Sequence, residues 1–304
     1  MEETIHGYHL KAPFQNRDAG FSRWTFATKN GREFFLKEFL NPVYPLNNTM
    51  GAELTEKARQ ACADYERRNI AIYRAVNAAS DGNLVRVESF FRNESHYYIA
   101  MERVPSERKS VREIAAFPYE DRLRLCRIIA HSVLCLHEKG IVHADIKDTN
   151  ILLKRTKKRT VTAKLVDFDC SFSVDDPPRK ETDLNGDQVY LSPEACRFFF
   201  GEQVPLTTRM DVFSLGILFH EYLTGELPKF DTEEYDYLHE AVLDGQKAGV
   251  SPSIPEKHRN MIEQMLVEDP AKRISMKEVC DILRPESLQA VSGGNWFSAA
   301  GDLA

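Results

Sequence analysis

The sequence predicts an α+β protein with two lobes, a small strand-rich lobe followed by a larger helical one. Up to residue 104, short runs of alternating apolar and polar residues are separated by turn signals, which is typical of strands. Beyond Pro105, apolar residues instead recur at the spacing of helices. The 304 residues are enough for two sizeable cores. We therefore expect lobes over residues 1–104 and 105–284, and a terminal tail over 285–304.

The first lobe is predicted to contain five strands and one long helix, with strands and turns beginning at residue 8. Asn30-Gly31 is a strong hairpin signal, and it separates two strand patterns at 23–28 and 32–39. A helical pattern follows over residues 53–78. The last two strands of this lobe are predicted at 84–92 and 96–104.

The second lobe is predicted to be mainly helical. The helical stripe over 119–139 ends at Gly140, a residue type that commonly closes helices. Residues 167–194 show no periodicity, and a loop of that length in a compact domain is usually functional or disordered. Residues 210–224 are apolar nearly all round, which indicates a buried helix. The other predicted elements are short strands at 151–153 and 163–166 and amphipathic segments at 233–243, 258–268 and 276–283.

Composition excludes several classes of protein. Apolar residues make up 42% of the chain and charged residues 28%, as in ordinary soluble proteins. A net charge of −6 argues against a general nucleic-acid binder. Six cysteines without a C-x-x-C pair favour free thiols in a reducing compartment. The first residues lack a signal peptide, and no apolar stretch is long enough to span a bilayer. We expect a cytoplasmic protein that binds neither nucleic acid nor membrane.

The strongest chemical signal is a short polar loop between two apolar runs, residues 141–153. It carries Asp145, Lys147 and Asn150. A carboxylate can orient a hydroxyl, an ammonium can meet phosphate charge, and an amide oxygen can bind Mg²⁺. Phosphoryl transfer requires this kind of positioning and charge neutralisation. Taken alone, the loop is also compatible with a polar turn before a strand.

Other motifs follow in a defined order. Lys37 ends the aromatic stretch Phe34-Phe-Leu-Lys37, Asp167-Phe-Asp169 follows an apolar strand, Ser192-Pro-Glu194 ends the long loop, and Asp211 opens the predicted buried helix. Together with the 141–153 loop, this array resembles the eukaryotic-type Ser/Thr protein kinase family over residues 10–284. The resemblance implies a bilobal protein kinase-like fold, ATP and Mg²⁺ as cofactors, and a protein substrate.

The resemblance assigns roles to the catalytic residues. Asp145 corresponds to the aspartate that orients the acceptor hydroxyl, and Lys147 to the lysine of Ser/Thr-directed members. Asn150 and Asp167 correspond to the two Mg²⁺ ligands. The resemblance further implies two structural contacts, an ion pair between Glu194 and Arg273 and a brace on the catalytic loop from Asp211.

The same comparison assigns the nucleotide contacts. Lys37 corresponds to the lysine that holds the α- and β-phosphates. Glu66 is its expected ion-pair partner, and Glu56 is the alternative. Met101 resembles the residue that gates the nucleotide pocket. The other expected contacts of the nucleotide are Gly20, Glu102, Val104 and Leu152.

The nucleotide-binding motifs depart from the family pattern. Only Gly20 remains of the phosphate-covering glycine loop. Trp24 and Phe35 stand where the family has Val and Ala above the adenine, so two large rings would narrow or tilt the base pocket. Asp169 replaces the glycine of the metal motif. Departures of this kind look like those of a divergent, possibly bacterial, member.

Two further departures concern regulation and residue preference. Ala144 replaces the arginine that, in many relatives, pairs with a phosphate on the activation loop. We therefore expect this loop to be set by other contacts, with activity that does not depend on its phosphorylation. Asp187 stands where Ser/Thr kinases usually place threonine, so the Ser/Thr preference rests mainly on Lys147.

Two other functions stay open at this point. One is a small-molecule phosphotransferase of the aminoglycoside or choline kinase type, whose metal motifs often lack glycine. The other is a nucleotide-binding pseudokinase scaffold, which the aromatic substitutions would suit. If the protein is a kinase, carboxylates around the substrate site favour a basic substrate peptide; they are Asp175, Asp176, Asp187, Glu226, Asp231, Glu233 and Glu234.

Overall fold

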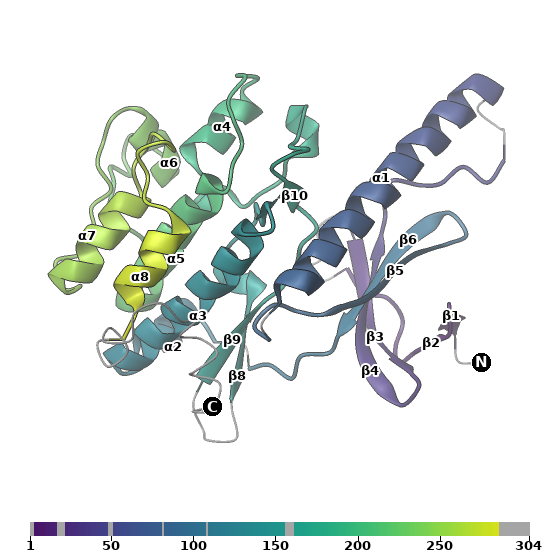
Figure 1. Cartoon of the computed structure of the whole chain (residues 1–304), viewed down its shortest axis with the longest axis horizontal. Coiled ribbons are helices and arrows are strands. Elements are labelled where there is room, and N and C mark those ends of the chain that lie inside the picture. Colours follow the sequence, from purple (N-terminus) through teal and green to yellow (C-terminus); the bar gives the residue numbers. More distant parts are fainter. Residues whose placement is uncertain are drawn as a thin grey trace. The chain divides into compact units, whose positions relative to one another are not determined.

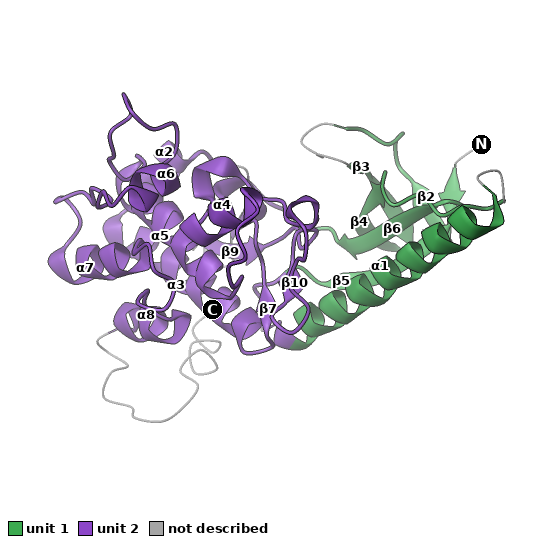
Figure 2. Ribbon diagram, turned by 90° about the horizontal axis from the view of Figure 1, so that it is seen from above, with its two compact units in different colours: residues 1–78, 85–105 green, residues 79–84, 106–304 purple. Residues whose placement is uncertain are grey.

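The structure, a computed structural model, describes residues 3–16, 22–47, 51–80, 82–107, 109–155 and 161–285. It divides into two compact units (Figure 2). Unit 1 contains residues 1–78 and 85–105, and unit 2 contains residues 79–84 and 106–304. The segment 79–84 belongs to unit 2 because Asn83 O accepts a hydrogen bond from the Leu165 N–H. Most of the expected tail, from residue 286 onwards, lies outside the described residues.

Unit 1 is built on a six-stranded antiparallel sheet with the order β1-β2-β3-β4-β6-β5 (Figure 1). This is one strand more than the sequence predicts, because the first residues form a short hairpin of their own. The strands are β1 (Thr4–Ile5), β2 (Tyr8–Leu10), β3 (Ser22–Lys29), β4 (Arg32–Phe39), β5 (Val87–Asn93) and β6 (His96–Glu102).

The hairpin predicted at Asn30-Gly31 joins β3 to β4. Both turn residues have positive φ, 51° for Asn30 and 72° for Gly31. This is the backbone that a two-residue turn of the favoured twist requires, and asparagine and glycine tolerate it best. The turn also fixes the register, which pairs Trp24 with Lys37 and Phe26 with Phe35.

One long helix, α1 (Ala52–Ala79), accompanies the sheet, close to the bounds that the sequence predicts. Tyr65 of α1 lies 6.2 Å from Phe39 and 5.2 Å from Tyr97, measured between ring centroids. Tyr73, two turns later, lies 5.4 Å from Phe90. The helix therefore packs one face of β4, β5 and β6. The opposite face holds a separate aromatic and aliphatic core that includes Tyr8, Phe34, Leu36, Phe91 and Tyr98.

Unit 2 is mainly helical. Its helices are α2 (Val111–Ala115), α3 (Tyr119–His137), α4 (Pro193–Phe199), α5 (Arg209–Thr224), α6 (Leu238–Leu243), α7 (Glu256–Met265) and α8 (Met276–Leu283). Its strands are β7 (Ile141–Val142), β8 (Ile151–Arg155), β9 (Val161–Leu165) and β10 (Phe172–Ser173). Three short 3₁₀ turns are η1 (Asp148–Asn150), η2 (Glu181–Asp183) and η3 (Gln188–Tyr190). The segment 167–194, predicted as a loop, thus contains β10, which pairs with β7.

Helix α5 forms the centre of unit 2, and the prediction of a buried helix is confirmed. Nearly all its residues are buried, including Asp211 and Gly216. A Cβ on Gly216 would lie 2.9 Å from Leu266 Cδ2, so glycine allows a neighbouring segment to approach the helix closely. Among the described residues, no helix is both long and apolar enough to cross a membrane.

The amphipathic segment predicted over 233–243 is only partly helical. Helix α6 begins at Leu238, because the Glu240 carboxylate accepts hydrogen bonds from the backbone N–H groups of Asp236 and Tyr237. These bonds end the preceding turn and cap the first turn of the helix. The five residues before Leu238 therefore remain outside the helix.

Candidate active site

Asp211, at the start of α5, holds the backbone of the predicted catalytic loop. Its carboxylate accepts hydrogen bonds from the N–H groups of His143 (2.8 Å) and Ala144 (2.9 Å). It also accepts one from His137 Nε2 at 2.9 Å. Asp211 is buried, so this buried carboxylate is satisfied by three donors. The brace predicted for Asp211 is therefore confirmed.

Two residues near this loop have a left-handed backbone. Ala144 and Asp167 both have φ of 65°, which is uncommon for residues with a side chain. Asp211 fixes Ala144 through its N–H. His143 Nε2 donates to Val166 O at 3.1 Å, which links the loop to the residue before Asp167. These contacts hold Ala144 and Asp167 in their strained backbone conformations, which set the directions of the Asp145 and Asp167 side chains.

The short loop on which the sequence places Asp145, Lys147 and Asn150 brings the three residues into direct contact. Lys147 Nζ lies 2.9 Å from Asp145 Oδ2 and 3.1 Å from Oδ1. Asn150 Nδ2 donates to Asp145 O at 2.7 Å and to Asp145 Oδ2 at 2.9 Å. Since the amide nitrogen faces Asp145, the Asn150 carbonyl oxygen remains available as a metal ligand.

Asp187 is a second carboxylate beside Lys147. Its Oδ2 lies 3.9 Å from Lys147 Nζ, while its Oδ1 accepts a hydrogen bond from the Val189 N–H at 3.0 Å. Burial lowers the pKa of Lys147, but the hydrogen bond and charge of Asp145 and the charge of Asp187 outweigh it. The pKa of Lys147 is therefore raised, and its ammonium stays charged next to the catalytic carboxylate.

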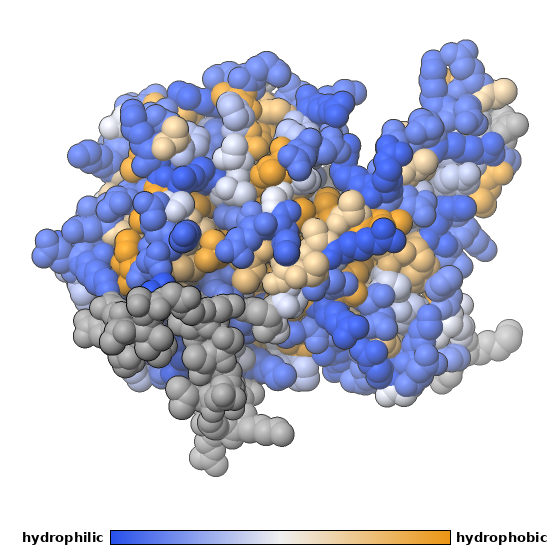
Figure 3. Space-filling view, in the orientation of Figure 1, coloured by the Kyte–Doolittle hydropathy of each residue, from blue (hydrophilic) through white to orange (hydrophobic). Residues whose placement is uncertain are grey.

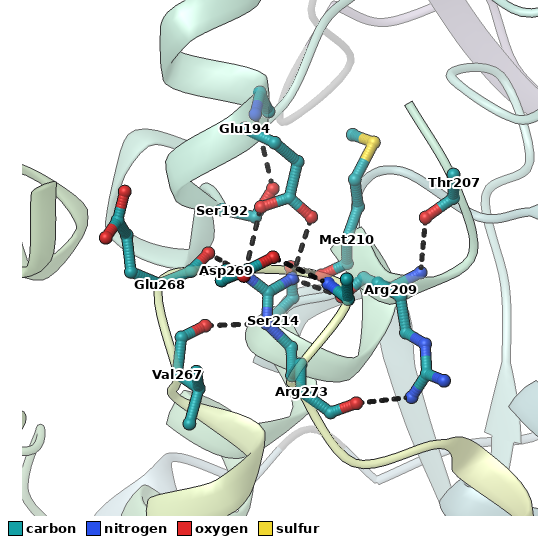
Figure 4. Close-up of polar contacts among 12 residues, drawn as sticks. Ser192, Glu194, Thr207, Arg209, Met210, Ser214, Val267, Glu268, Asp269 and Arg273 are labelled. Atoms are coloured by element: carbon teal, nitrogen blue, oxygen red, sulfur yellow. Dashed lines mark hydrogen bonds and ion pairs between the residues drawn. The ribbon is translucent and has the colours of Figure 1, made fainter. Parts of the chain in front are cut away.

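The predicted ion pair between Glu194 and Arg273 is confirmed (Figure 4). Arg273 Nη1 and Nη2 donate to the two Glu194 carboxylate oxygens at 2.7 and 3.0 Å. Arg273 also donates to the carbonyl oxygens of Val267, Glu268 and Arg209. Arg273 is buried, and it ties the start of α4 to α5 and to the segment before α8.

In unit 1, Lys37 lies on β4 opposite Trp24 of β3 and Ile99 of β6. Phe35, two residues earlier, projects from the same face of the sheet. The Trp24 and Phe35 rings are stacked, with centroids 5.2 Å apart and an interplanar angle of 27°. The two rings predicted to narrow the base pocket thus form one continuous aromatic surface beside Lys37.

The comparisons with known proteins agree with this geometry. A family model described as "Protein kinase domain" matches residues 53–282. The chain belongs to the protein kinase domain family. It is 28% identical over 218 residues to calcium-dependent protein kinase 19 of Oryza sativa subsp. japonica. The aligned region covers 70% of this chain and 39% of that protein.

Similar matches come from other plants. Calcium-dependent protein kinase 33 of Arabidopsis thaliana is 28% identical over 70% of this chain and 40% of its own length. Calcium-dependent protein kinase 2 of Zea mays is 27% identical over the same shares. The chain therefore spans about 40% of the length of these curated relatives.

In this kinase domain, residues 167–194 form the activation segment. Ala144 packs against an apolar cluster that includes side chains of this segment. The cluster joins Phe172, Leu184 and Leu191 of that segment to buried residues of α4 and α5. Leu184 is 2% exposed. Ser171 Oγ donates to His143 O at 3.1 Å, a polar link between the same two segments. Apolar packing thus holds the segment around Ala144. This is the position at which many family members have an arginine that pairs with a phosphate on the activation loop.

The expected ion pair between Lys37 and Glu66 is not formed, and Glu56 does not replace Glu66. Within the described residues, neither glutamate has a cationic partner within ion-pair distance. The helical stripe that α1 turns toward the sheet contains Tyr65, Asn69 and Tyr73. Glu66, three residues before Asn69 and seven before Tyr73, lies at the edge of the same helical face and is half-buried.

Asn69 is the polar residue that the sequence analysis missed on this stripe. It is 7% exposed, and its Nδ2 donates to Tyr65 O at 2.9 Å. The signal was available in the sequence, because Asn69 lies four residues from both Tyr65 and Tyr73. The stripe therefore includes a buried amide whose hydrogen bond stays within α1.

The other predicted nucleotide contacts have different settings. Met101 is buried on β6. Glu102 donates its N–H to Arg86 O at 3.0 Å, and its Oε1 accepts the Arg86 N–H at 2.9 Å. No hydrogen bond within the described residues uses the backbone of half-buried Val104, which therefore suits an adenine edge. Leu152 is half-buried on β8, and Gly20 lies outside the described residues.

Glu221 is an acidic residue that the sequence analysis did not single out. It lies on α5, and its Oε2 accepts a hydrogen bond from the Tyr190 hydroxyl at 2.6 Å. Burial raises the pKa of Glu221 to about 7 against the opposing effect of that bond, and the charges of Asp148 and Asp187 add to the rise. Asp148 and Asp187, near the catalytic loop, thus disfavour the charged form of Glu221.

Proposed function

We propose that this protein is an ATP-dependent protein kinase that phosphorylates serine or threonine in a protein substrate. The observation that carries the proposal is the hydrogen-bonded group of Asp145, Lys147 and Asn150 on a loop that Asp211 holds in place. Membership of the protein kinase domain family supports it and disfavours a small-molecule phosphotransferase. The six free cysteines support a reducing, cytoplasmic location.

The proposed mechanism is in-line transfer of the ATP γ-phosphoryl group. The acceptor hydroxyl donates a hydrogen bond to the Asp145 carboxylate, which fixes its oxygen for attack and takes its proton. A new bond forms between that oxygen and phosphorus, and the bond from phosphorus to the leaving ADP oxygen breaks. Lys147, kept charged by Asp145 and Asp187, offsets the negative charge on the transferred group.

The nucleotide and metal would be held by residues from several elements. Asn150 and Asp167 offer an amide oxygen and a carboxylate, the oxygen ligands that Mg²⁺ prefers, and the bound Mg²⁺ would neutralise phosphate charge. In the described part of the chain, no three His, Cys, Asp or Glu side chains form a metal site. Such a sparse ligand set suits Mg²⁺, which keeps water and substrate phosphates as ligands. Lys37 would meet the α- and β-phosphates, and Val104 the adenine.

We further propose that the substrate is basic near its acceptor residue. Asp148, Asp187 and Glu221 form the acidic group near the catalytic loop, and the raised pKa of Glu221 reflects burial and their mutual repulsion. A lysine or arginine of the substrate would relieve that repulsion. This proposal narrows the carboxylates expected from the sequence to those near the loop.

The decisive experiment compares the wild-type protein with Asp145→Asn. Both are incubated with Mg-ATP and a peptide library, and phosphorylated positions are mapped by mass spectrometry. The wild type should modify Ser and Thr peptides with basic neighbours, while Asp145→Asn should lose a factor of about 10²–10⁴ in rate. Magnesium-dependent thermal stabilisation by ATP should be equal in both. Equal rates in the two proteins, or transfer to small alcohols alone, would contradict the proposal.

A further inference from the structure

A second recessed surface lies in unit 2, between the end of α4, the turn 232–236 and α6. It is an open groove with a volume of about 600 Å³. Its lining residues are Cys196, Arg197, Phe200, Glu202, Thr232, Glu233, Glu234, Tyr235, Asp236, Glu240, Leu243 and Asp244. None of them belongs to the catalytic loop or to the Asp148, Asp187 and Glu221 group. We call this surface the α4–α6 groove.

The charge of the α4–α6 groove is strongly negative and largely uncompensated. Six of its lining residues are acidic and one is basic. The cation, Arg197, already contacts Glu268 (3.0 Å) and Glu202 (3.9 Å). Over the described residues, the other five carboxylates form no ion pair. Like charges held together without cations repel one another, so a cationic ligand would be attracted to the groove.

Two of these carboxylates have structural tasks, and three do not. Glu240 caps α6, and Asp244 Oδ2 accepts the Tyr235 hydroxyl at 2.8 Å. The side chains of Glu233, Glu234 and Asp236 make no hydrogen bond within the described part of the chain, and all three are exposed. The fold itself therefore does not account for these three charges.

The groove also has an apolar component. Phe200 is 83% exposed, the highest value among the large hydrophobic side chains that the structure describes. Buried Cys196 and half-buried Leu243 line the groove with it. Figure 3 shows hydrophobic surface over α4 among hydrophilic neighbours. Aromatic side chains are enriched at protein interfaces, so Phe200 offers the groove an apolar contact for a partner.

Titratable groups in the groove respond to the negative field. The pKa of the Cys196 thiol is raised by burial and by the charges of Glu240 and Glu202. The pKa of Tyr235 is raised to about 12, first by its hydrogen bond to Asp244 and then by burial and neighbouring acidic charges. Both shifts are those expected where negative potential is concentrated.

We propose that the α4–α6 groove is a docking site for a basic stretch of a partner protein, in which Lys or Arg side chains meet Glu233, Glu234 and Asp236 and an apolar side chain covers Phe200. The groove is open and its rim is charged, whereas small-molecule pockets are mostly apolar and enclose their ligand. Charge complementarity therefore favours an extended cationic peptide. The site would hold a partner away from the residue that accepts the phosphoryl group.

The test measures peptide binding directly, without ATP. The probe is the fluorescein-labelled peptide Gly-Arg-Lys-Leu-Arg-Lys-Gly, which has no hydroxyl residue, and the readout is fluorescence anisotropy at low ionic strength. The triple variant Glu233→Gln/Glu234→Gln/Asp236→Asn removes three charges and leaves the Glu240 and Asp244 hydrogen bonds intact. We expect the triple variant to bind the probe with a dissociation constant about tenfold larger than that of the wild type.

Two further comparisons assign the contacts. Phe200→Ser should weaken binding of the probe severalfold. A second probe, with glycine in place of leucine, should bind equally to Phe200→Ser and to the wild type. Raising the ionic strength from about 0.01 M to about 0.15 M shortens the Debye length from about 30 Å to about 8 Å and should weaken wild-type binding. The salt effect should be smaller in the triple variant.

The matched control neutralises two exposed carboxylates elsewhere in unit 2, Glu256→Gln/Glu263→Gln on α7. This variant and Asp145→Asn should bind the probe like the wild type, which separates the groove from the catalytic loop. Equal binding by the triple variant and wild type would overturn the proposal, as would the absence of binding at low salt. Concentration-dependent dimerisation that the triple variant abolishes would also overturn it, because the groove would then hold a second copy of this chain.

Discussion

The catalytic loop of unit 2 and the β3–β4 strands of unit 1 differ in how closely they keep the family pattern. The family model matches residues 53–282 and leaves out both strands. The loop retains Asp145, Lys147 and Asn150 in mutual contact, whereas β3 and β4 carry Trp24 and Phe35 in place of small residues. The difference follows from what each region must do.

Chemistry at a reacting atom needs side-chain groups at fixed positions, and each is held by specific hydrogen bonds. Asp211 alone fixes three donors around the loop. A nucleotide base, in contrast, is held largely by backbone groups and by apolar surface, which many side chains can provide. The β3–β4 face therefore tolerates changes of side chain, whereas changes in the loop would be costly.

The largest effect is expected for Asp211→Ala, because it leaves three donors without their acceptor in a buried place. Each unsatisfied donor costs about 1–3 kcal/mol, so the free energy of unfolding should fall by about 3 kcal/mol or more. Urea unfolding measures this loss, and transfer activity should disappear with it. Asp211→Asn keeps one acceptor oxygen and should lose less. An Asp211→Ala protein as stable as wild type would mean that the loop does not depend on this brace.

A somewhat smaller effect is expected in the activation segment. Leu184→Ala removes a side chain that is 2% exposed from the cluster against which Ala144 packs. Buried Leu→Ala substitutions cost about 2–5 kcal/mol, and the lower end applies to a segment that can relax. Transfer activity should fall in parallel, while phosphatase treatment of the wild type should change nothing. Loss of activity after phosphatase treatment, restored by phosphorylation of Ser171, Ser173 or Thr182, would show that the segment depends on phosphate.

The third prediction concerns pH and the acidic group near the loop. The folded-state pKa of Glu221, about 7, lies above its ordinary value of 4.5. Between these values the folded protein keeps a proton that the unfolded chain has released, so stability falls as pH rises from about 4.5 to about 7. The fall should be on the order of 2 kcal/mol. Urea unfolding across this range should show a smaller fall for Glu221→Gln. Parallel curves for both proteins would contradict the raised pKa.

The smallest effect is expected on the β3–β4 face. Trp24→Val/Phe35→Ala removes an aromatic surface whose stacking with adenine would contribute about 0.5–1.5 kcal/mol. The KM for ATP should rise severalfold, with kcat close to that of the wild type. Steady-state kinetics with varied ATP measures both. A lower KM in the variant would mean that the rings obstruct the base.

Much of the fold and of the catalytic loop could be predicted because the signals are local. Asn30-Gly31 specifies its hairpin through its own backbone preference, and Asp145, Lys147 and Asn150 lie within one short loop. The ion pair of Glu194 with Arg273 joins distant residues, but the resemblance to a family supplied that pairing. The confirmed parts thus came either from local physics or from a complete motif.

The expected pairing of Lys37 with Glu66 or Glu56 required information about side-chain distances that the sequence does not contain. Glu66 lies on the same side of α1 as Asn69 and Tyr73, so its position on the helix alone does not tell whether its carboxylate reaches a cation. Glu233 and Glu234, which were expected around the substrate cleft, line the α4–α6 groove. Their place depends on where α6 begins, which the Glu240 cap determines.

Ala144 has a consequence for how such a kinase would be controlled in a cell. If the packing of Phe172, Leu184 and Leu191 replaces an activating phosphate, as we expect from Ala144, the enzyme would be competent as soon as it has folded. On this hypothesis, a phosphatase that acts on the segment would not inhibit the enzyme. Its output would then follow the rates at which the protein is synthesised and degraded, together with the supply of the proteins that it modifies.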